Sequence, residues 1–242
     1  MKIRGILFDK DGTIIDYWRT WVPINREVAL FAGSGDAALA AELLRANGQD
    51  PDTNTVAGSS VLAVGSILQI ANAFAAQLGE RAPVNLAAGV ERVFTEGGAK
   101  HAALIPGADR AIALLKQRGL RIGVATNDSV AGLQASLKRT GILDVFDFTV
   151  GYDSGYGTKP EPGMALAFCK AVGLEPGEIA VVGDAAHDLA MGRAAKAGLT
   201  VGVRSGTGTE EQLRPLADLM VDSINDLPAR PAFGKRWWQL FA

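Results

Sequence analysis

After about residue 100, short apolar runs alternate with segments of helical periodicity, and this alternation constrains the fold more than any other feature of the sequence. Each run is short and rich in β-branched residues, which is typical of a buried strand. The segments between them place apolar residues three and four positions apart, as expected of a helix with one buried face. The pattern predicts right-handed strand–helix–strand units, and therefore an α/β fold with a doubly wound, mostly parallel sheet covered on both faces. The predicted strands of this region are 121–127, 146–151, 178–184, 200–204 and 219–221.

The first predicted strand, residues 3–9, stands apart from the others. The sequence that follows it is rich in alanine, has helical periodicity and carries almost no strand signal. Pro106 and Gly107 then mark the return to the alternating pattern. We therefore expect an α/β core domain formed by residues 1–15 and 100–242, and a helical domain, residues 16–99, inserted after the first strand.

The charge balance excludes one class of partner. The chain has 24 Lys and Arg residues against 26 Asp and Glu, a formal net charge of −2, so it lacks the basic excess that drives binding to nucleic acids. One uncharged stretch, 53–79, is long enough to cross a bilayer. It contains serines, glutamines and an asparagine, so we expect a pair of helices there rather than a membrane span.

Two features bear on the compartment. The single cysteine, Cys169, lies in an apolar helical segment and has no partner for an internal disulfide. The N-terminal apolar run ends in acidic residues within nine positions, which does not fit a secretory signal. A cytoplasmic protein is the expectation.

Polar side chains gather where the predicted strands end. Ligands of open α/β sheets bind outside the carboxyl ends of the strands, so we expect these side chains to meet at one edge of the sheet. The first strand ends at Asp9 and is followed by Asp11, Gly12 and Thr13; the second ends in Thr126 and Asn127; and the fourth ends at Asp184 and is followed by Asp188. Lys159 lies in a loop ahead of the fourth strand.

In this order the segments resemble the four motifs of the haloacid dehalogenase-like (HAD) hydrolase superfamily. The motifs read Asp9-x-Asp11-Gly12-Thr13, Thr126-Asn127, Lys159-Pro160 and Gly183-Asp184-x-x-x-Asp188. The insertion between the first two motifs is similar to the helical cap of the phosphoglycolate phosphatase-like branch. The resemblance extends to about Leu227 and implies a Rossmann-like core with an inserted helical cap.

The resemblance also implies a phosphomonoester hydrolase that forms an aspartyl-phosphate intermediate. Asp9 would be the nucleophile, Asp11 the general acid and base, and Lys159 the cation that offsets negative charge on nucleophile and phosphate. Mg²⁺ is the expected cofactor because it accepts a few carboxylate oxygens and keeps room for water and a substrate phosphate. The expected phosphate-binding residues are Gly12, Thr126, Asn127 and Lys159, and the expected metal ligands are Asp9, Asp11, Asp184 and Asp188.

Several of these residues also have a plainer interpretation. An Asp-Gly pair after a strand is a common turn, and the segment 126–128 is a good helix N-cap sequence. Asp188 could complement the N-terminus of its own helix instead of contacting a metal.

Other polar residues receive no catalytic role from the sequence. Strand alternation predicts that Lys10 faces away from Asp9 and Asp11. His101 and His187 are expected to face solvent, because two histidines without a cysteine partner give no zinc signature. The glycine- and threonine-containing segment 206–209 lacks a third glycine and a following lysine, so a plain turn is expected.

Three functions remain open at this stage. The leading one is a Mg²⁺-dependent phosphatase, a monomer or homodimer, that acts on a small phosphorylated metabolite such as 2-phosphoglycolate. The alternatives are a sugar-phosphate mutase of the same superfamily and a non-catalytic module that binds a phosphorylated metabolite. Asp11 argues against the dehalogenases and phosphonate hydrolases of the superfamily, which lack or replace this acid.

The resemblance also implies that the helical insertion supplies substrate specificity. Its first segment carries Trp18, Arg19, Trp21 and Arg26, and an arginine there could clamp a substrate carboxylate or could simply face water. The aromatic segment 233–241 at the end of the chain is expected to pack back onto the core.

Overall fold

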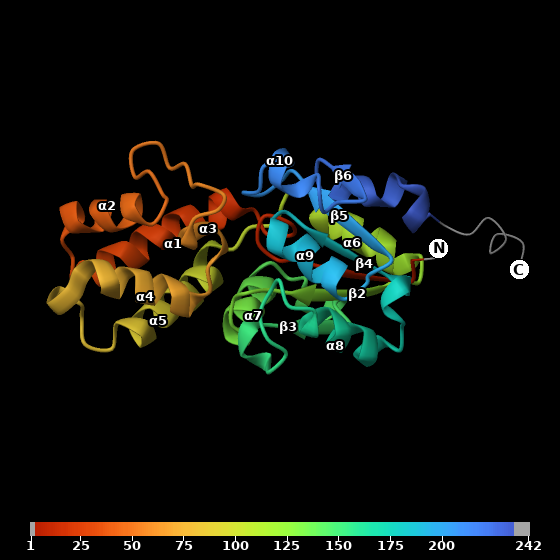
Figure 1. The fold of residues 1–242 in the computed structure, drawn as a ribbon, viewed down its shortest axis with the longest axis horizontal. Coiled ribbons are helices and arrows are strands. Elements are labelled where there is room, and N and C mark those ends of the chain that lie inside the picture. Colours follow the sequence, from red (N-terminus) through yellow and green to blue (C-terminus); the bar gives the residue numbers. More distant parts are fainter. Residues whose placement is uncertain (1–2, 235–242) are drawn as a thin grey trace, which may run out of the picture.

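The computed structural model describes residues 3–234 and consists of a lobe built on a β-sheet and a lobe built of helices (Figure 1). All six strands of the sheet are parallel, in the order β3-β2-β1-β4-β5-β6. The alternating pattern thus predicted the fold class correctly. The strands are β1 (Gly5–Phe8), β2 (Arg121–Ala125), β3 (Phe148–Val150), β4 (Ile179–Gly183), β5 (Leu199–Val203) and β6 (Leu219–Val221).

The order of the strands creates a crevice at one place on the sheet edge. From β1 the chain first adds β2 and β3 on one side, and then crosses to add β4, β5 and β6 on the other. Phe8, the last residue of β1, lies level with Val124 of β2 and Val182 of β4. The carboxyl ends of β1 and β4 therefore lie side by side at the point where the winding reverses, which is where ligands bind in sheets of this kind.

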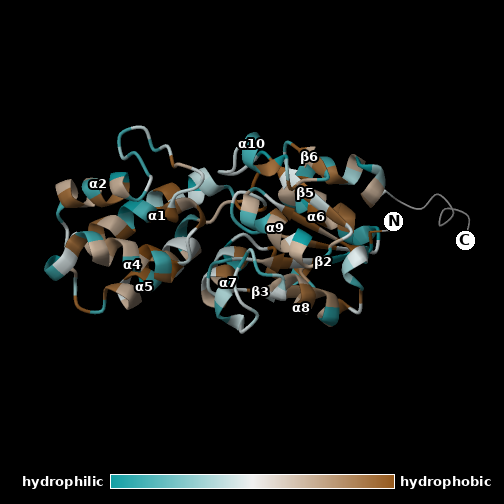
Figure 2. Cartoon of the chain, viewed as in Figure 1, coloured by the Kyte–Doolittle hydropathy of each residue, from teal (hydrophilic) through white to brown (hydrophobic). Residues whose placement is uncertain are grey.

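Helices cover both faces of the sheet, and the alternation of side chains along β1 shows the two layers. Ile6 and Phe8 point into the cluster beneath α6 (Ala108–Gln117) and α7 (Val130–Arg139), whereas Leu7 points into the cluster beneath α8 (Gly163–Val172) and α9 (Ala186–Ala194). Figure 2 shows hydrophobic residues along the strands and on the helices that cover them. The short helix α10 (Glu210–Leu213) follows β5.

The helical lobe has a hydrophobic core of its own. Ile24, Val28, Leu43, Phe74 and Val90 are fully buried within it, and its most extensive helix–helix contact is between α1 and α5. Because this lobe buries its own apolar surface, we propose that residues 16–99 form one unit and residues 1–15 with 100–242 the other. The helices of the lobe are α1 (Tyr17–Ala32), α2 (Ala37–Ala46), α3 (Val61–Val64), α4 (Ile67–Leu78) and α5 (Leu86–His101).

The uncharged stretch 53–79 forms α3 and α4, which agrees with the predicted pair of helices. Ser66 begins α4 with a capping box: its hydroxyl accepts from the backbone N–H of Gln69, and the Gln69 side chain accepts from the backbone N–H of Ser66. Among residues 3–234, no helix combines the length and the apolar character needed to cross a bilayer.

Two short segments connect the lobes, and they lie next to each other. Ile15 forms an antiparallel bridge with Leu104, the backbone N–H of Asp16 donates to the Ala103 carbonyl at 2.8 Å, and the Ile105 N–H donates to the Ile14 carbonyl at 2.9 Å. The helical lobe is therefore an insertion whose two ends meet at the sheet lobe.

The C-terminal end of the described chain returns to the sheet lobe. Phe233 is 1% exposed and packs into the cluster beneath α6. Trp237, Trp238 and the other residues of 235–242 lie outside the described residues, so packing of the aromatic tail stays a prediction.

Candidate active site

Two acidic residues stand at the crevice because each directly follows a strand. Asp9 follows β1, and its backbone N–H still donates to the Val182 carbonyl of β4 at 2.7 Å. Asp184 follows β4. Gly12 then turns the chain back with a φ of 83°, and a Cβ there would lie 2.5 Å from Asp184 Oδ2. Only glycine allows both this backbone conformation and this close approach.

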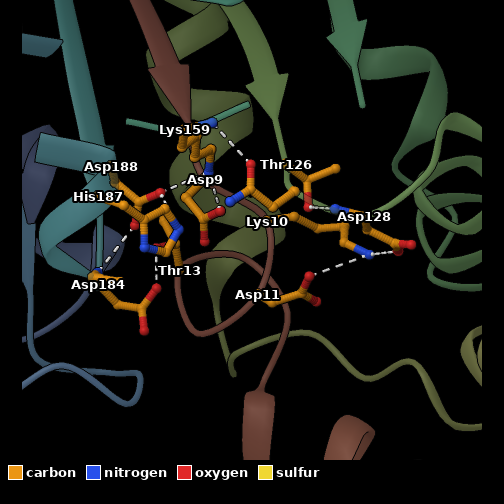
Figure 3. A network of polar contacts seen from close by, with 12 residues as sticks. Asp9, Lys10, Asp11, Thr13, Thr126, Asp128, Lys159, Asp184, His187 and Asp188 are labelled. Atoms are coloured by element: carbon orange, nitrogen blue, oxygen red, sulfur yellow. Dashed lines mark hydrogen bonds and ion pairs between the residues drawn. The ribbon is translucent and has the colours of Figure 1, made fainter. Parts of the chain in front are cut away.

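Three buried carboxylates meet at this point. Asp9, Asp184 and Asp188 each offer an oxygen atom, and the three atoms lie within 4.8 Å of one another. Lys159 reaches the same place, with its Nζ 2.5 Å from Asp9 Oδ1 and 2.7 Å from Asp188 Oδ1, and its side chain is fully buried (Figure 3). The structure thus brings together four residues that the sequence placed in three separate motifs.

The pKa values at this cluster reflect burial and crowding of negative charge. Burial raises the pKa of Asp9 and Asp184, and repulsion from the neighbouring carboxylates raises both further. Burial opposes ionisation of Asp188 too, but the charge of Lys159 and the hydrogen bonds to the carboxylate outweigh it and lower the pKa. Conversely, burial would lower the pKa of Lys159, but Asp188 and Asp9 raise it.

The donor set fits a divalent cation. Three carboxylates surround a single ammonium group, so the cluster is net negative when all of them are ionised, and a phosphate dianion would be repelled without further positive charge. Carboxylate oxygens in small number are the ligands that Mg²⁺ accepts while it retains water and a substrate phosphate.

Asp11 lies apart from the three-carboxylate cluster. Its Oδ1 accepts from the indole Nε1 of Trp21 at 2.5 Å, and its Oδ2 lies 3.3 Å from Lys10 Nζ. Burial raises the pKa of Asp11 to about 6, although the charge of Lys10 acts against the shift. A carboxyl group that gains and loses its proton near neutral pH suits general acid–base catalysis. The structure does not bring the Asp11 carboxylate to the expected metal ligands.

The side chain of Lys10 does not point in the predicted direction. Its fully buried side chain faces Asp11, places Nζ 2.5 Å from Asp128 Oδ2, and lies 4.9 Å from the centre of the Trp21 ring. The prediction that Lys10 faces away from Asp11 is wrong because β1 ends at Phe8. Beyond Phe8 the backbone turns, with the N–H groups of both Ile14 and Ile15 donating to the Lys10 carbonyl, so strand alternation no longer applies.

The segment after β2 organises the loop that carries Lys159. Asn127 Oδ1 accepts from the Lys159 backbone N–H at 3.0 Å, and Thr126 Oγ1 accepts from the Asp128 N–H at 3.1 Å. The N-cap of α7 is Ser129 rather than a residue of 126–128, which corrects the expected cap. Thr126 and Asn127 both line the cleft.

Asp188 contacts the start of its own helix and the carboxylate cluster at the same time. Its Oδ2 accepts from the Ala185 N–H at the start of α9, at 3.0 Å, while its Oδ1 faces Lys159 in the cluster. The hydrogen bond from the Ala185 N–H holds the Asp188 carboxylate so that its other oxygen faces Lys159 and the neighbouring carboxylates.

The segment 206–209 contacts the site and is more than a plain turn. The backbone N–H of Thr207 donates to Asp184 Oδ2 at 2.8 Å, and a Cβ on Gly206 would lie 1.9 Å from the same oxygen. The sequence could not predict this contact, because nothing in the local sequence indicates that the loop 206–209 lies beside the end of β4.

A cleft between the lobes opens onto the cluster and is lined by residues of both. His187 lines this cleft with a side chain 22% exposed, and His101 is 24% exposed with its Nε2 3.1 Å from Glu27 Oε1, so both are only partly exposed to solvent. From the helical lobe, Trp21 reaches the site, whereas Arg26 donates to the Pro51 carbonyl.

Comparison with known proteins places the chain among hydrolases. The model of the haloacid dehalogenase-like hydrolase family matches residues 3–196. The chain is 33% identical over 126 residues to "Probable phosphatase IndB" of Dickeya dadantii, an alignment that spans 51% of this chain and 54% of that relative. It is 27% identical to a phosphoglycolate phosphatase of Shigella boydii, covering 96% of this chain and 93% of the relative.

Solved structures share the fold. A crystal structure of a predicted phosphoglycolate phosphatase from Haemophilus somnus superimposes with a TM-score of 0.71 at 21% identity, covering 94% of this chain and 97% of that one. A β-phosphoglucomutase from Clostridium difficile superimposes with a TM-score of 0.66 at 22% identity, covering 93% of each chain.

Proposed function

The chain belongs to the haloacid dehalogenase-like hydrolase family, and from this premise we propose that it is a Mg²⁺-dependent phosphomonoesterase acting on a small phosphorylated metabolite. One observation carries the proposal: Asp9, Asp184, Asp188 and Lys159 meet at the crevice of the sheet, and Asp11 follows Asp9 by two residues. The names of the curated relatives are consistent with phosphate-ester hydrolysis.

In the proposed first half-reaction, a carboxylate oxygen of Asp9 attacks the phosphorus atom in line with the leaving alcohol. A P–O bond forms to Asp9, the P–O bond to the alcohol breaks, and the proton of Asp11 passes to the departing oxygen. Lys159 offsets negative charge on Asp9 and on the phosphoryl oxygens.

In the second half-reaction, Asp11 takes a proton from the water that attacks the aspartyl phosphate. Inorganic phosphate leaves, and Asp9 returns as a carboxylate while Asp11 is again protonated. Asp9, Asp184 and Asp188 would hold the Mg²⁺, which supplies positive charge for the phosphate when bound.

Asp9→Asn tests the proposal. An amide cannot form the acyl phosphate, so hydrolysis of p-nitrophenyl phosphate with Mg²⁺ is expected to vanish while the circular dichroism spectrum is retained. Asp144→Asn, at an exposed aspartate remote from the cleft, is the matched control and keeps full activity. Retained hydrolysis in Asp9→Asn would contradict the assignment of the nucleophile.

Two further assays separate the alternative functions. A mutase would interconvert phosphosugar isomers when primed with a sugar bisphosphate; release of free phosphate without isomerisation excludes it. A non-catalytic module would give no turnover on a panel of phosphate esters while one of them still raised the melting temperature. The likeness to β-phosphoglucomutase, at 22% identity, shows the fold alone.

A further inference from the structure

The wall that the helical lobe presents to the cleft beside Asp9 and Asp184 is mostly apolar, while Ser59, Ser66 and Gln69 of the same lobe border the adjoining hollow beside Lys159 and His187. The wall is formed by Trp21, Leu62, Val64, Ile67, Ile70 and Phe94, opposite the carboxylates of the sheet lobe. Two polar side chains in the same wall already have partners: the Tyr17 hydroxyl donates to the Leu62 carbonyl at 2.7 Å, and Asn25 Nδ2 donates to Gln49 Oε1 at 2.9 Å. This wall therefore offers hydrophobic surface to whatever is attached to the phosphate.

The basic side chains of the helical lobe lie elsewhere. Within residues 17–101, none of them lines the cleft. Most are held by other groups on the outside of the lobe: Arg45 pairs with Asp52, Arg92 with Glu96, and Lys100 and His101 with Glu27, while Arg26 donates to the Pro51 carbonyl and Arg19 and Arg81 are exposed.

The two buried lysines of the sheet lobe near the cleft already have carboxylate partners. Lys159 lies between Asp9 and Asp188, and Lys10 lies between Asp11 and Asp128. His187 is the one further side chain among the described cleft residues that can carry a positive charge, and its Nε2 lies 3.4 Å from Asp188 Oδ1.

We propose that the substrate is the phosphate ester of an uncharged, largely apolar alcohol rather than of a hydroxy acid such as glycolate. This inference rests on the proposed phosphatase function. A carboxylate on the leaving group would be desolvated against the apolar wall without a cation of its own, which is costly, whereas an alkyl or aromatic group would bury surface there.

Esters of primary alcohols test the inference because their leaving groups have similar chemistry. We expect kcat/KM with Mg²⁺ to be at least tenfold higher for benzyl phosphate than for 2-phosphoglycolate, and tenfold higher for n-butyl phosphate than for 4-phosphooxybutanoate. Equal values, or a preference for the carboxylates, would overturn the inference and leave the phosphatase function intact. No turnover of any ester, including p-nitrophenyl phosphate, would overturn both.

A charge added to the wall gives a second test. Val64 is half-buried and borders the cleft, so Val64→Lys places a cation there with little disturbance of the core. The ratio of kcat/KM for 2-phosphoglycolate to that for benzyl phosphate is expected to rise at least tenfold. Val64→Met controls for side-chain size: it adds no charge, so the ratio is not expected to rise.

Leu68→Lys is the matched control for charge. Leu68 is 53% exposed on the next helix and does not border the cleft, so the same added cation is expected to leave the ratio at its original value. A change of the same size in Val64→Lys and Leu68→Lys, or none in Val64→Lys, would contradict the proposed character of the wall.

Discussion

At the scale of single residues, Lys10 carries a charge in a fully buried position. It is fully buried, and its ammonium group is surrounded by Asp11, Asp128 and the face of the Trp21 ring. Burial would lower the pKa of Lys10, but the charges of Asp11 and Asp128 raise it, so the group stays protonated. Lys10 thus compensates the two acids.

Removal of the Lys10 charge is expected to lower the free energy of unfolding. Lys10→Met would leave two largely buried carboxylates without a counter-ion, and we expect a loss of about 3 kcal/mol in the free energy of unfolding. Urea denaturation measures it. The double variant Lys10→Met, Asp128→Asn should lose less than Lys10→Met alone, because one of the unpaired charges is gone; a larger loss would show that the ion pair is not the cause.

Trp21 is expected to position Asp11 rather than to react. Trp21→Phe keeps an aromatic ring against Phe94 but loses the N–H that donates to Asp11. A hydrogen bond to a charged group corresponds to about 1.5 kcal/mol, so we expect kcat on p-nitrophenyl phosphate to fall about tenfold. Trp18→Phe is the matched control: Trp18 lies on the same helix, is 40% exposed and does not line the cleft. Equal losses in the two variants would exclude a specific role for Trp21.

At the scale of elements, the carboxylate of Asp147 connects strand β2 to helix α6, which covers the sheet. Asp147 precedes β3; its Oδ2 accepts from the Ile122 N–H of β2 at 2.8 Å, and its Oδ1 lies 2.9 Å from Lys116 Nζ of α6. Burial acts against ionisation, but the hydrogen bond from Ile122 and the charge of Lys116 lower the pKa of Asp147.

The lowered pKa fixes the pH dependence of this contact. Stabilisation by a carboxylate of lowered pKa is complete above the unfolded value, 3.8 for Asp147, and is lost as the pH falls through the folded value. Asp147→Asn should therefore cost about 1–2 kcal/mol at pH 7 and progressively less below pH 4. Urea denaturation at several pH values checks it; a difference that does not change with pH would contradict it.

The elements also show how far the sequence could predict the structure. Each strand was predictable because a buried parallel strand is a short apolar run, and Asp9 and Asp184 were predictable site residues because each directly follows one. The direction of Lys10 was not, because a turn with its own hydrogen bonds sets it. The contacts of Trp21 and Thr207 depend on how a helix of the other lobe and a distant loop pack, which local patterns do not encode.

At the scale of the whole molecule, the cluster of carboxylates predicts a measurable response to metal. The buried acids of this cluster repel one another, so a bound Mg²⁺ should stabilise the folded protein. At a concentration near one hundred times its dissociation constant, the gain is about 2.7 kcal/mol, and the melting temperature should rise by roughly 5 °C or more.

Asp184→Asn provides the comparison for this response. The variant removes one expected ligand, so Mg²⁺ should raise its melting temperature much less than that of the wild type. Differential scanning calorimetry with Mg²⁺, with EDTA and with Na⁺ at equal ionic strength separates specific binding from a salt effect. Equal shifts for Mg²⁺ and Na⁺ would mean that the three carboxylates do not form a metal site.

The two connecting segments, bridged at Ile15 and Leu104, have a consequence for how new specificity can arise. The chain leaves the sheet lobe and returns to it at one point, so the helical lobe is inserted into the sheet lobe in the way that a long loop would be. Under the proposed function, we expect mutations or exchanges within residues 17–101 to alter which alcohol is accepted while Asp9 and Lys159 keep their places, provided that an equivalent of Trp21 is retained. Evolution could therefore change the substrate preference of such a protein without changing the residues expected to react with the phosphate.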